Sequence, residues 1–400
     1  MRQRYIGRAL LAAAAVLGGA VTGRAQAPAN IGFDAPLNSD PTIPIPTGRA
    51  GAAGFYTSAE FVILTQTRTL GEQTVAFRGL VDSTGSITGV PGTYIGSGRE
   101  ALNTRELGRT TYTPGFRAEL GYRFEDGTQV YANYMQLFET SYSAGASLVP
   151  PFFRSRADLA DTFLTSGVFN FTPQYAGPQV KTAFDPPGSQ ASNTYGIWNG
   201  STVQDIKFTQ RFQQFELGGR VPLFQTDYSR VYGLAGGRFD WFFERFTWRT
   251  VAYDASGNTG PQFRANYTNT LSQRLYGPFA GFGHEVFVAN QFSLSLDLTG
   301  ALLLGIVKER AKYELGDEST QAKRGVNEYS VVPNANAALN LWWYPIEGVQ
   351  VRIGYQAMSF FNTKNMLDPI GFNYGAIDPV YETQVFRLIH GINVGVGLFF

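Results

Sequence analysis

The sequence predicts an all-β fold, a transmembrane antiparallel up-and-down β-barrel of about 10–12 strands. Three observations lead to this prediction. Apolar residues alternate with polar or small ones, short connections alternate with long ones, and charge is scarce. Charged residues make up 16% of the 400 residues and aromatic residues 14%, whereas an ordinary soluble domain carries roughly 25% charge.

The clearest alternation lies at the C-terminus. One face of this last strand carries Ile392, Val394, Val396, Leu398 and Phe400, and the other carries glycines and Asn393. The same split appears in four further segments: 116–124, 292–306, 335–343 and 349–356. Weaker alternation marks five more: 54–69, 128–142, 203–220, 228–250 and 264–288. The strand count is therefore about ten, and the stretch 70–110 is long enough to hold another hairpin.

The segment 203–220 changes phase along its length. Ile206, Phe208 and Phe212 share one parity, and the apolar residues that follow share the other: Phe215, Leu217 and Val221. An extra residue in one strand shifts every later side chain to the opposite face. The sequence therefore predicts a bulge around Gln213 and Gln214.

The predicted connections differ in length. Four are short: 125–127, 221–227, 288–291 and 344–348. Five are longer: 70–110, 143–202, 251–263, 314–325 and 363–380. Outer-membrane barrels have short periplasmic turns and long extracellular loops, so both ends of the barrel chain are expected in the periplasm.

A soluble β-sandwich would show the same alternation, so other features must separate the two folds. The polar faces of these strands are too poor in charge for a sheet that faces water. The strand ends are rich in rings, typical of aromatic girdles at the two membrane interfaces: Trp241, Trp342, Trp343, Tyr344, Phe399 and Phe400. In lipid the strands must close on themselves, because an unpaired edge leaves backbone groups unsatisfied.

The N-terminus predicts export. Arg2, Arg4 and Arg8 precede a short apolar stretch, and residues 1–25 form a signal peptide with cleavage expected after Ala25. Residues 26–50 form a proline-rich linker and residues 51–400 the barrel. Cleavage removes four of the 32 Lys and Arg and none of the 31 Asp and Glu. The remaining chain has no excess of basic residues, so binding to nucleic acid is not expected. Cysteine is absent, and this suits an oxidising periplasm.

Two resemblances refine the prediction. Residues 392–400 resemble the terminal signal by which outer-membrane proteins are recognised for insertion, with a final aromatic and alternating apolar residues before it. Residues 114–124 (PGFRAELGYRF) and the aromatic strand after them are similar to the Legionella-type major outer membrane protein family of pore-forming barrels. The chain is thus expected in the outer membrane of a Gram-negative-type envelope. Its expected partners are membrane lipid, lipopolysaccharide and the outer-membrane assembly machinery.

Little in the sequence indicates an enzyme or a metal site. The two histidines, His284 and His390, lack a nucleophile elbow or lipase pattern around them, so we expect no enzyme and no catalytic residues. Asp317 and Glu318 are interpreted as a solvated loop, with loose Ca²⁺ binding left open. Residues 233–237 are glycine-rich but precede no helix, which favours packing within a strand. No cofactor and no metal site are predicted.

Parity places a set of charged side chains inside the barrel. They are Glu60, Arg117, Glu119, Arg123, Glu216, Arg220, Arg238, Asp240, Glu244, Asp297, Arg352 and Arg387. One interpretation is a constriction that orients a passing solute, and the other is a network of ion pairs that fills a narrow barrel. The apolar stretch 158–171 in the long 143–202 connection could narrow the channel, cap it or bind a partner.

The sequence therefore predicts a porin-like pore for passive passage of small polar solutes, either monomeric or homo-oligomeric. The alternative is a closed structural or adhesive barrel whose external loops contact other surfaces.

Overall fold

The computed structural model describes twelve stretches of the chain. They are 53–82, 88–90, 93–147, 162–166, 196–199, 201–226, 228–252, 259–289, 291–319, 321–346, 348–373 and 376–400. Contacts divide the chain into Met1–Asp40 and Pro41–Phe400, and every described residue belongs to the second unit. The predicted signal peptide (1–25), the linker (26–50) and the apolar stretch 158–171, apart from 162–166, lie outside the described residues.

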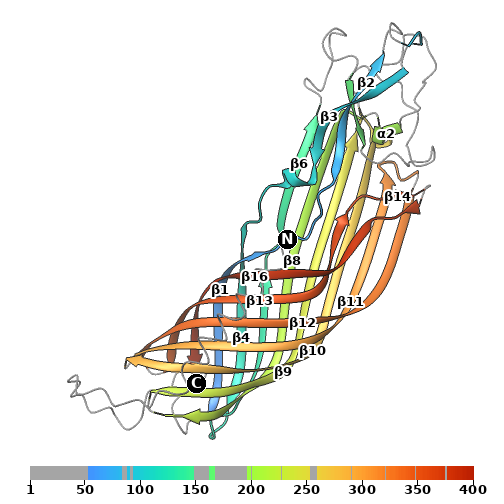
Figure 1. Ribbon diagram of the computed structural model, residues 1–400. Coiled ribbons are helices and arrows are strands. Elements are labelled where there is room, and N and C mark those ends of the chain that lie inside the picture. The colour runs from blue at the N-terminus through green and yellow to red at the C-terminus, as the bar shows by residue number, and fades with distance from the viewer. Residues whose placement is uncertain are drawn as a thin grey trace, which may run out of the picture. The chain divides into compact units, whose positions relative to one another are not determined.

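The main sheet closes into a ring. Its strands are β1 (Gly54–Gln66), β4 (Tyr112–Arg123), β5 (Gln129–Leu137), β8 (Val203–Gln225), β9 (Ser229–Val251), β10 (Arg264–Ala289), β11 (Phe292–Leu315), β12 (Gln321–Ile346), β13 (Val349–Asp368) and β16 (Val380–Phe399). The hydrogen-bonded order is β5-β4-β1-β16-β13-β12-β11-β10-β9-β8, and an antiparallel β5–β8 pairing closes it (Figure 1). An eleventh strand, β6 (Thr140–Ser147), pairs farther along β8. The predicted all-β barrel is confirmed, with ten strands in the described ring.

Smaller elements lie outside the ring. β2 (Thr74–Asp82) pairs with β3 (Thr93–Asn103) and β7 (Thr162–Ser166), so the stretch 70–110 does contain a further hairpin. The remaining elements are β14 (Phe372–Asn373), β15 (Ala376–Ile377), the 3-10 turns η1 (Thr104–Leu107) and η2 (Pro261–Phe263), and α2 (Gly196–Asn199). None of the helices in the described stretches has the length and apolar character needed to cross a membrane.

One end of the ring carries the tight turns. The β4–β5 turn is closed by Phe124 N donating to the Thr128 carbonyl at 2.8 Å, with Gly127 at φ +85°. Gly348 in the β12–β13 turn has φ +83°, a conformation that glycine adopts without steric cost. At the other end β11 runs to Leu315 and β12 starts at Gln321. The predicted long connection 314–325 is therefore wrong, because both strands continue where a loop was expected.

The outer face is apolar over the part that lipid would cover. The five residues of the predicted insertion signal are 39–73% exposed: Ile392, Val394, Val396, Leu398 and Phe400. Leu294 and Ile353 are 42% and 53% exposed, as expected of side chains that face acyl chains and not a dry interior. Of the aromatic residues assigned to the interfacial girdles, Trp343 faces outward. Trp342 and Tyr344 are 8% exposed and face inward, because side chains alternate along β12.

The predicted bulge at Gln213 and Gln214 is wrong. β8 pairs with β9 in continuous register from Val203 to Pro222, and the register shifts only between Pro222 and Phe224. The phase change has another cause. The apolar residues beyond position 214 face outward, whereas Ile206, Phe208 and Phe212 are buried inside. Where the strand leaves lipid its outer face meets water, so the apolar side chains move to the inner face while the strand stays regular.

The interior contains two apolar clusters. The cluster nearer the tight turns includes the rings of Phe212, Phe242 and Phe360, and the other includes Trp198 and Trp248. Figure 1 shows β8 to β12 extending toward β2, β3 and α2, the region of the second cluster. A barrel of about ten strands has an interior only slightly wider than side chains can fill.

Candidate functional site

The structure places all twelve predicted charged residues on the inner face of ring strands, buried or half-buried. Nine of them form ion pairs: Arg117 and Arg352 with Glu60, Arg220 with Glu119, Arg238 with Glu216, and Arg387 with Glu244. Asp240 accepts a hydrogen bond from Gln214 at 2.9 Å, and Asp297 accepts one from the Tyr232 hydroxyl. Arg123 is also buried, with 4% exposure.

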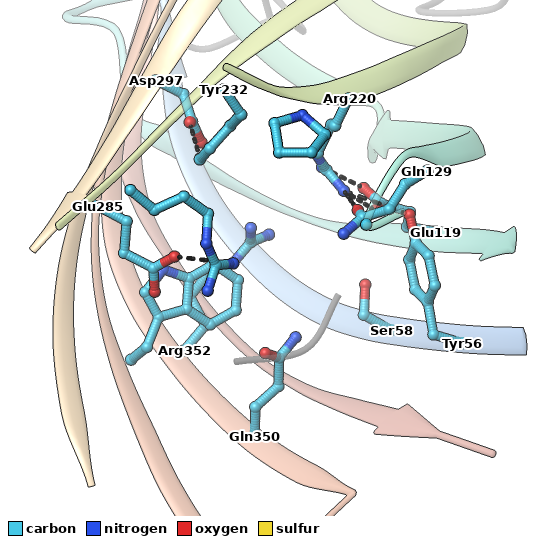
Figure 2. Close-up of a pocket in the computed structure, with 14 residues that line it drawn as sticks. Tyr56, Ser58, Glu119, Gln129, Arg220, Tyr232, Glu285, Asp297, Gln350 and Arg352 are labelled. Carbon is cyan, nitrogen blue, oxygen red and sulfur yellow. Dashed lines mark hydrogen bonds and ion pairs between the residues drawn. The ribbon is translucent and has the colours of Figure 1, made fainter. Parts of the chain in front are cut away.

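A vestibule lies inside the barrel near the tight turns (Figure 2). This space is lined by Glu119, Arg220, Tyr232, Asp297, Trp342 and Arg352, among others. Arg220 donates to both carboxylate oxygens of Glu119, at 2.8 and 3.3 Å. The guanidinium of Arg220 also lies 4.4 Å from the centre of the Tyr131 ring. The hydrogen bonds with Glu119 and the contact with the Tyr131 ring together hold the Arg220 guanidinium in a fixed position.

Farther inside, the charges join strands that are not neighbours. Arg117 lies 3.4 Å from Glu60 on the next strand and also donates to Gln356 on β13. Arg238 donates to Glu216 at 2.6 Å and to Asn334 on β12. The contacts with Gln356 and Asn334 cross the interior, and charges of both signs face the same space.

An aromatic layer, formed by Phe212, Phe242 and Phe360, follows these charges. The ring centroids of Phe212 and Phe242 are 5.0 Å apart, and those of Phe242 and Phe360 are 4.9 Å apart. All three side chains are fully buried. The sequence prediction missed this layer because it assigned apolar side chains to the lipid face and only polar ones to the lumen.

Beyond the aromatic layer lies a second level of buried charge. Arg387 donates to the two oxygens of Glu244 at 2.6 and 2.9 Å. Lys364 contacts Glu309 at 3.0 Å, and the sequence prediction named neither. Glu309 could have been found by continuing the parity of β11 beyond Ile306, since Val307, Glu309 and Ala311 all face inward.

The histidines lie on the outer face. His284 Nε2 is 2.8 Å from the Ser229 hydroxyl, and His390 Nδ1 is 2.6 Å from the Tyr355 hydroxyl. Ser229 and His284 lie at the far ends of two consecutive strands, β9 and β10, and are 55 residues apart in sequence, so no local sequence pattern predicts their contact. A serine nucleophile also needs an acid that orients the histidine and donors for an oxyanion. Within the stretches that the structure describes, no group of three or more His, Asp and Glu could hold a metal ion.

A closed ring of antiparallel strands with an apolar exterior and charges inside defines the class of outer-membrane β-barrel proteins. Residues 81–379 match the family model described as the Legionella pneumophila major outer membrane protein precursor. The chain belongs to this family, and its place is the outer membrane. The resemblance seen in residues 114–124 is thereby confirmed.

Several solved structures match the chain at low sequence identity. The outer membrane protease OmpT from Escherichia coli is 10% identical, with a TM-score of 0.43 over 87% of this chain and 97% of that chain. A Pseudomonas aeruginosa FadL homologue is 10% identical, with a TM-score of 0.25 over 86% and 90%. The Pseudomonas putida toluene transporter TodX is 9% identical, with a TM-score of 0.23 over 91% and 93%. No curated protein matches the sequence significantly.

Proposed function

We propose that this protein is an outer-membrane pore for small polar solutes and that the conformation described here is its closed state. The observation that supports the proposal is the vestibule, in which opposed acids and bases line a space near the periplasmic end. Fixed charges of both signs orient polar solutes and set ion selectivity.

The cost of buried charge also supports a pore. Replacing a buried ion pair with well-packed apolar side chains is often neutral or stabilising. A barrel with only a structural role would therefore be as stable with an apolar filling. Here ion pairs lie on both sides of the aromatic layer, with Arg238–Glu216 on one side and Arg387–Glu244 on the other. We interpret that layer as a hydrophobic gate, which excludes water until its rings move apart.

A closed structural barrel is the competing function, and the two apolar clusters favour it. Under that alternative neither cluster would ever open. We include no enzymatic step in the proposal, because the Ser229–His284 contact faces outward and lacks an orienting acid among the residues described.

Conductance of the refolded full-length mature protein in planar lipid bilayers separates the two functions. We expect stepwise openings that become longer or larger in the variant Phe242→Ala/Phe360→Ala. The matched control is Phe215→Ala/Phe239→Ala, which removes two rings of the outer face and should behave as the wild type. Silence of both wild type and gate variant, with the heat-modifiable mobility of a folded barrel intact, would contradict the pore and support the structural barrel.

A further inference from the structure

The outer face of β8, β9, β10 and β11 carries a cluster of basic side chains, which we call the basic patch. It consists of Arg211, Arg245, Arg274, Lys308 and Arg310. These four strands are consecutive neighbours in the ring, and adjacent strands are about 4.8 Å apart. Five cations thus share one continuous surface.

Strand register gives the position of the basic patch along the strands, relative to the apolar band. Phe215, Phe239, Tyr276 and Leu304 form one cross-strand row of the apolar band. Arg274 lies two residues beyond Tyr276, in the row of Trp241. The next row contains Arg211 and Lys308, and the row after it contains Arg245 and Arg310. Each row adds about 7 Å along the strands, so the cations directly follow the apolar band, on the side away from the periplasmic turns.

The apolar side chains of the same strands locate the membrane boundary independently. Beyond these rows the apolar residues of β9, β10 and β11 turn inward, as Phe246, Tyr267 and Tyr313 do. A strand whose outer face is still in lipid would keep its apolar residues outside. The basic patch therefore lies at the level of the outer-leaflet headgroups.

Aromatic rings hold the arginines in place. The Arg211 guanidinium lies 5.0 Å from the Trp241 ring centre and 4.8 Å from that of Phe243. Arg274 lies 5.6 Å from Trp241, and Arg245 lies 5.2 Å from Phe243. The Trp241 indole is itself fixed, because its Nε1 donates to Ser272 at 2.9 Å. Stacked arginines lose little conformational freedom when they bind an anion.

The basic patch is short of acidic partners. Among the described residues, none of its five cations has a carboxylate within 4.0 Å, whereas two outer-face cations beyond it, Arg249 and Lys312, are paired with Asp205 and Glu314. The Arg211 Nε is buried without a hydrogen-bond acceptor in the structure. A partly desolvated cation without a counter-ion is unfavourable, so an anion at this position would be stabilising.

The cations are confined to one side of the barrel. In their described parts, β1, β4, β5, β13 and β16 have no Lys or Arg on the outer face, because their basic residues point inward. A general attraction to anionic lipid would not require such a one-sided arrangement.

We propose that the basic patch binds the phosphate groups of a phosphorylated lipid headgroup in the outer leaflet. The acyl chains of this lipid would lie on Phe215, Phe239, Tyr276 and Leu304. Arginine forks match phosphate oxygens in a two-point contact, and an indole fits the boundary between headgroups and acyl chains. The proposal does not depend on whether the barrel conducts.

The test uses the refolded full-length mature protein in detergent, with purified lipopolysaccharide as the phosphorylated lipid. We expect the variant Arg211→Gln/Arg245→Gln/Arg274→Gln/Lys308→Gln to bind it about tenfold more weakly or worse, with a reduced dependence on salt. The matched control removes four exposed cations elsewhere: Arg99→Gln/Arg109→Gln/Arg264→Gln/Lys323→Gln. It should bind as the wild type does.

Three outcomes would overturn the proposal. One is an equal loss of affinity in both variants, which would indicate a general charge effect. Another is unchanged affinity in the patch variant. The third is inorganic phosphate, added at millimolar concentration, binding with the same dependence on these residues while lipopolysaccharide does not bind. If the fourfold variant fails to fold, Trp241→Ala replaces it, because it removes the support of Arg211 and Arg274 and should weaken binding without changing the charge.

Discussion

Arg387 on β16 and Glu244 on β9 form a two-point ion pair across the interior of the barrel. The two strands are five positions apart in the ring of ten, and therefore opposite each other. Both side chains are completely buried. Glu244 also accepts hydrogen bonds from Thr69 at 2.8 Å and Gln210 at 3.1 Å, and Arg387 Nε donates to Thr363 at 3.2 Å. The hydrogen-bonding groups of this buried ion pair are therefore satisfied by residues from several strands.

Removal of one partner of this ion pair should be strongly destabilising. We expect Glu244→Ala or Arg387→Ala alone to lower the free energy of unfolding by about 3–5 kcal/mol, because each leaves a buried charge unpaired. The double variant Glu244→Leu/Arg387→Leu should be close to the wild type. Urea unfolding of the refolded protein in lipid vesicles, followed by tryptophan fluorescence, measures these changes.

The exposed Arg249–Asp205 pair is the control for this experiment. Its removal should change the unfolding free energy by less than about 1 kcal/mol, because solvent screens exposed pairs. A double Leu variant whose loss equals the sum of the two single losses would show that the pair is not coupled.

Arg352 should influence ion selectivity if the vestibule conducts. Its guanidinium lies 4.9 Å from the Trp342 ring centre and contacts Glu60. Arg352→Glu would place two carboxylates together at the lining, so we expect the reversal potential in a salt gradient to shift toward cation selectivity. The outer-face variant Lys323→Glu has the same charge change and should leave it unaltered. An unaltered reversal potential in Arg352→Glu would place this residue outside the conduction path.

Much of the fold could be predicted from alternation alone. Leu294 and Ile353 face outward as their parity required, because in lipid an apolar side chain has only one favourable side. The inward placement of charges such as Arg117 and Arg387 follows from the same rule. The tight turns could be predicted from glycines and from the short segments between strands, since a turn depends on neighbouring residues.

The rest depends on contacts between distant segments. The same parity rule failed for Ile206, Phe208 and Phe212, because the sequence does not state where a strand leaves the membrane. The sequence also could not predict which acid pairs with which base. Arg387 and Glu244 are brought together only by closure of the ring and by its stagger.

The terminal aromatic should matter more for assembly than for stability. Phe400 is 73% exposed, and its backbone N–H donates to the Phe55 carbonyl at 2.9 Å. Phe400→Ser keeps this hydrogen bond but removes the ring, so we expect slower appearance of the heat-modifiable folded form in cells. Phe386→Ser, on the outer face of the same strand with 44% exposure, is the control. Equal delays in the two variants would show that lost apolar surface, and not a terminal signal, is responsible.

Two neighbouring glycines of β9 test how closely the strands pack. A Cβ on Gly236 would lie 2.2 Å from the Leu217 carbonyl oxygen and 2.9 Å from the Phe279 ring, whereas a Cβ on Gly237 would meet nothing within 4 Å. We therefore expect Gly236→Ala to lower the free energy of unfolding by about 1–3 kcal/mol, because the backbone must shift to relieve the overlap. Gly237→Ala, on the outer face, should change it by less than about 0.5 kcal/mol. Urea unfolding in vesicles compares the two variants directly. If both have the stability of the wild type, this glycine-rich run is not required for close strand packing, and the reason for its composition must lie elsewhere.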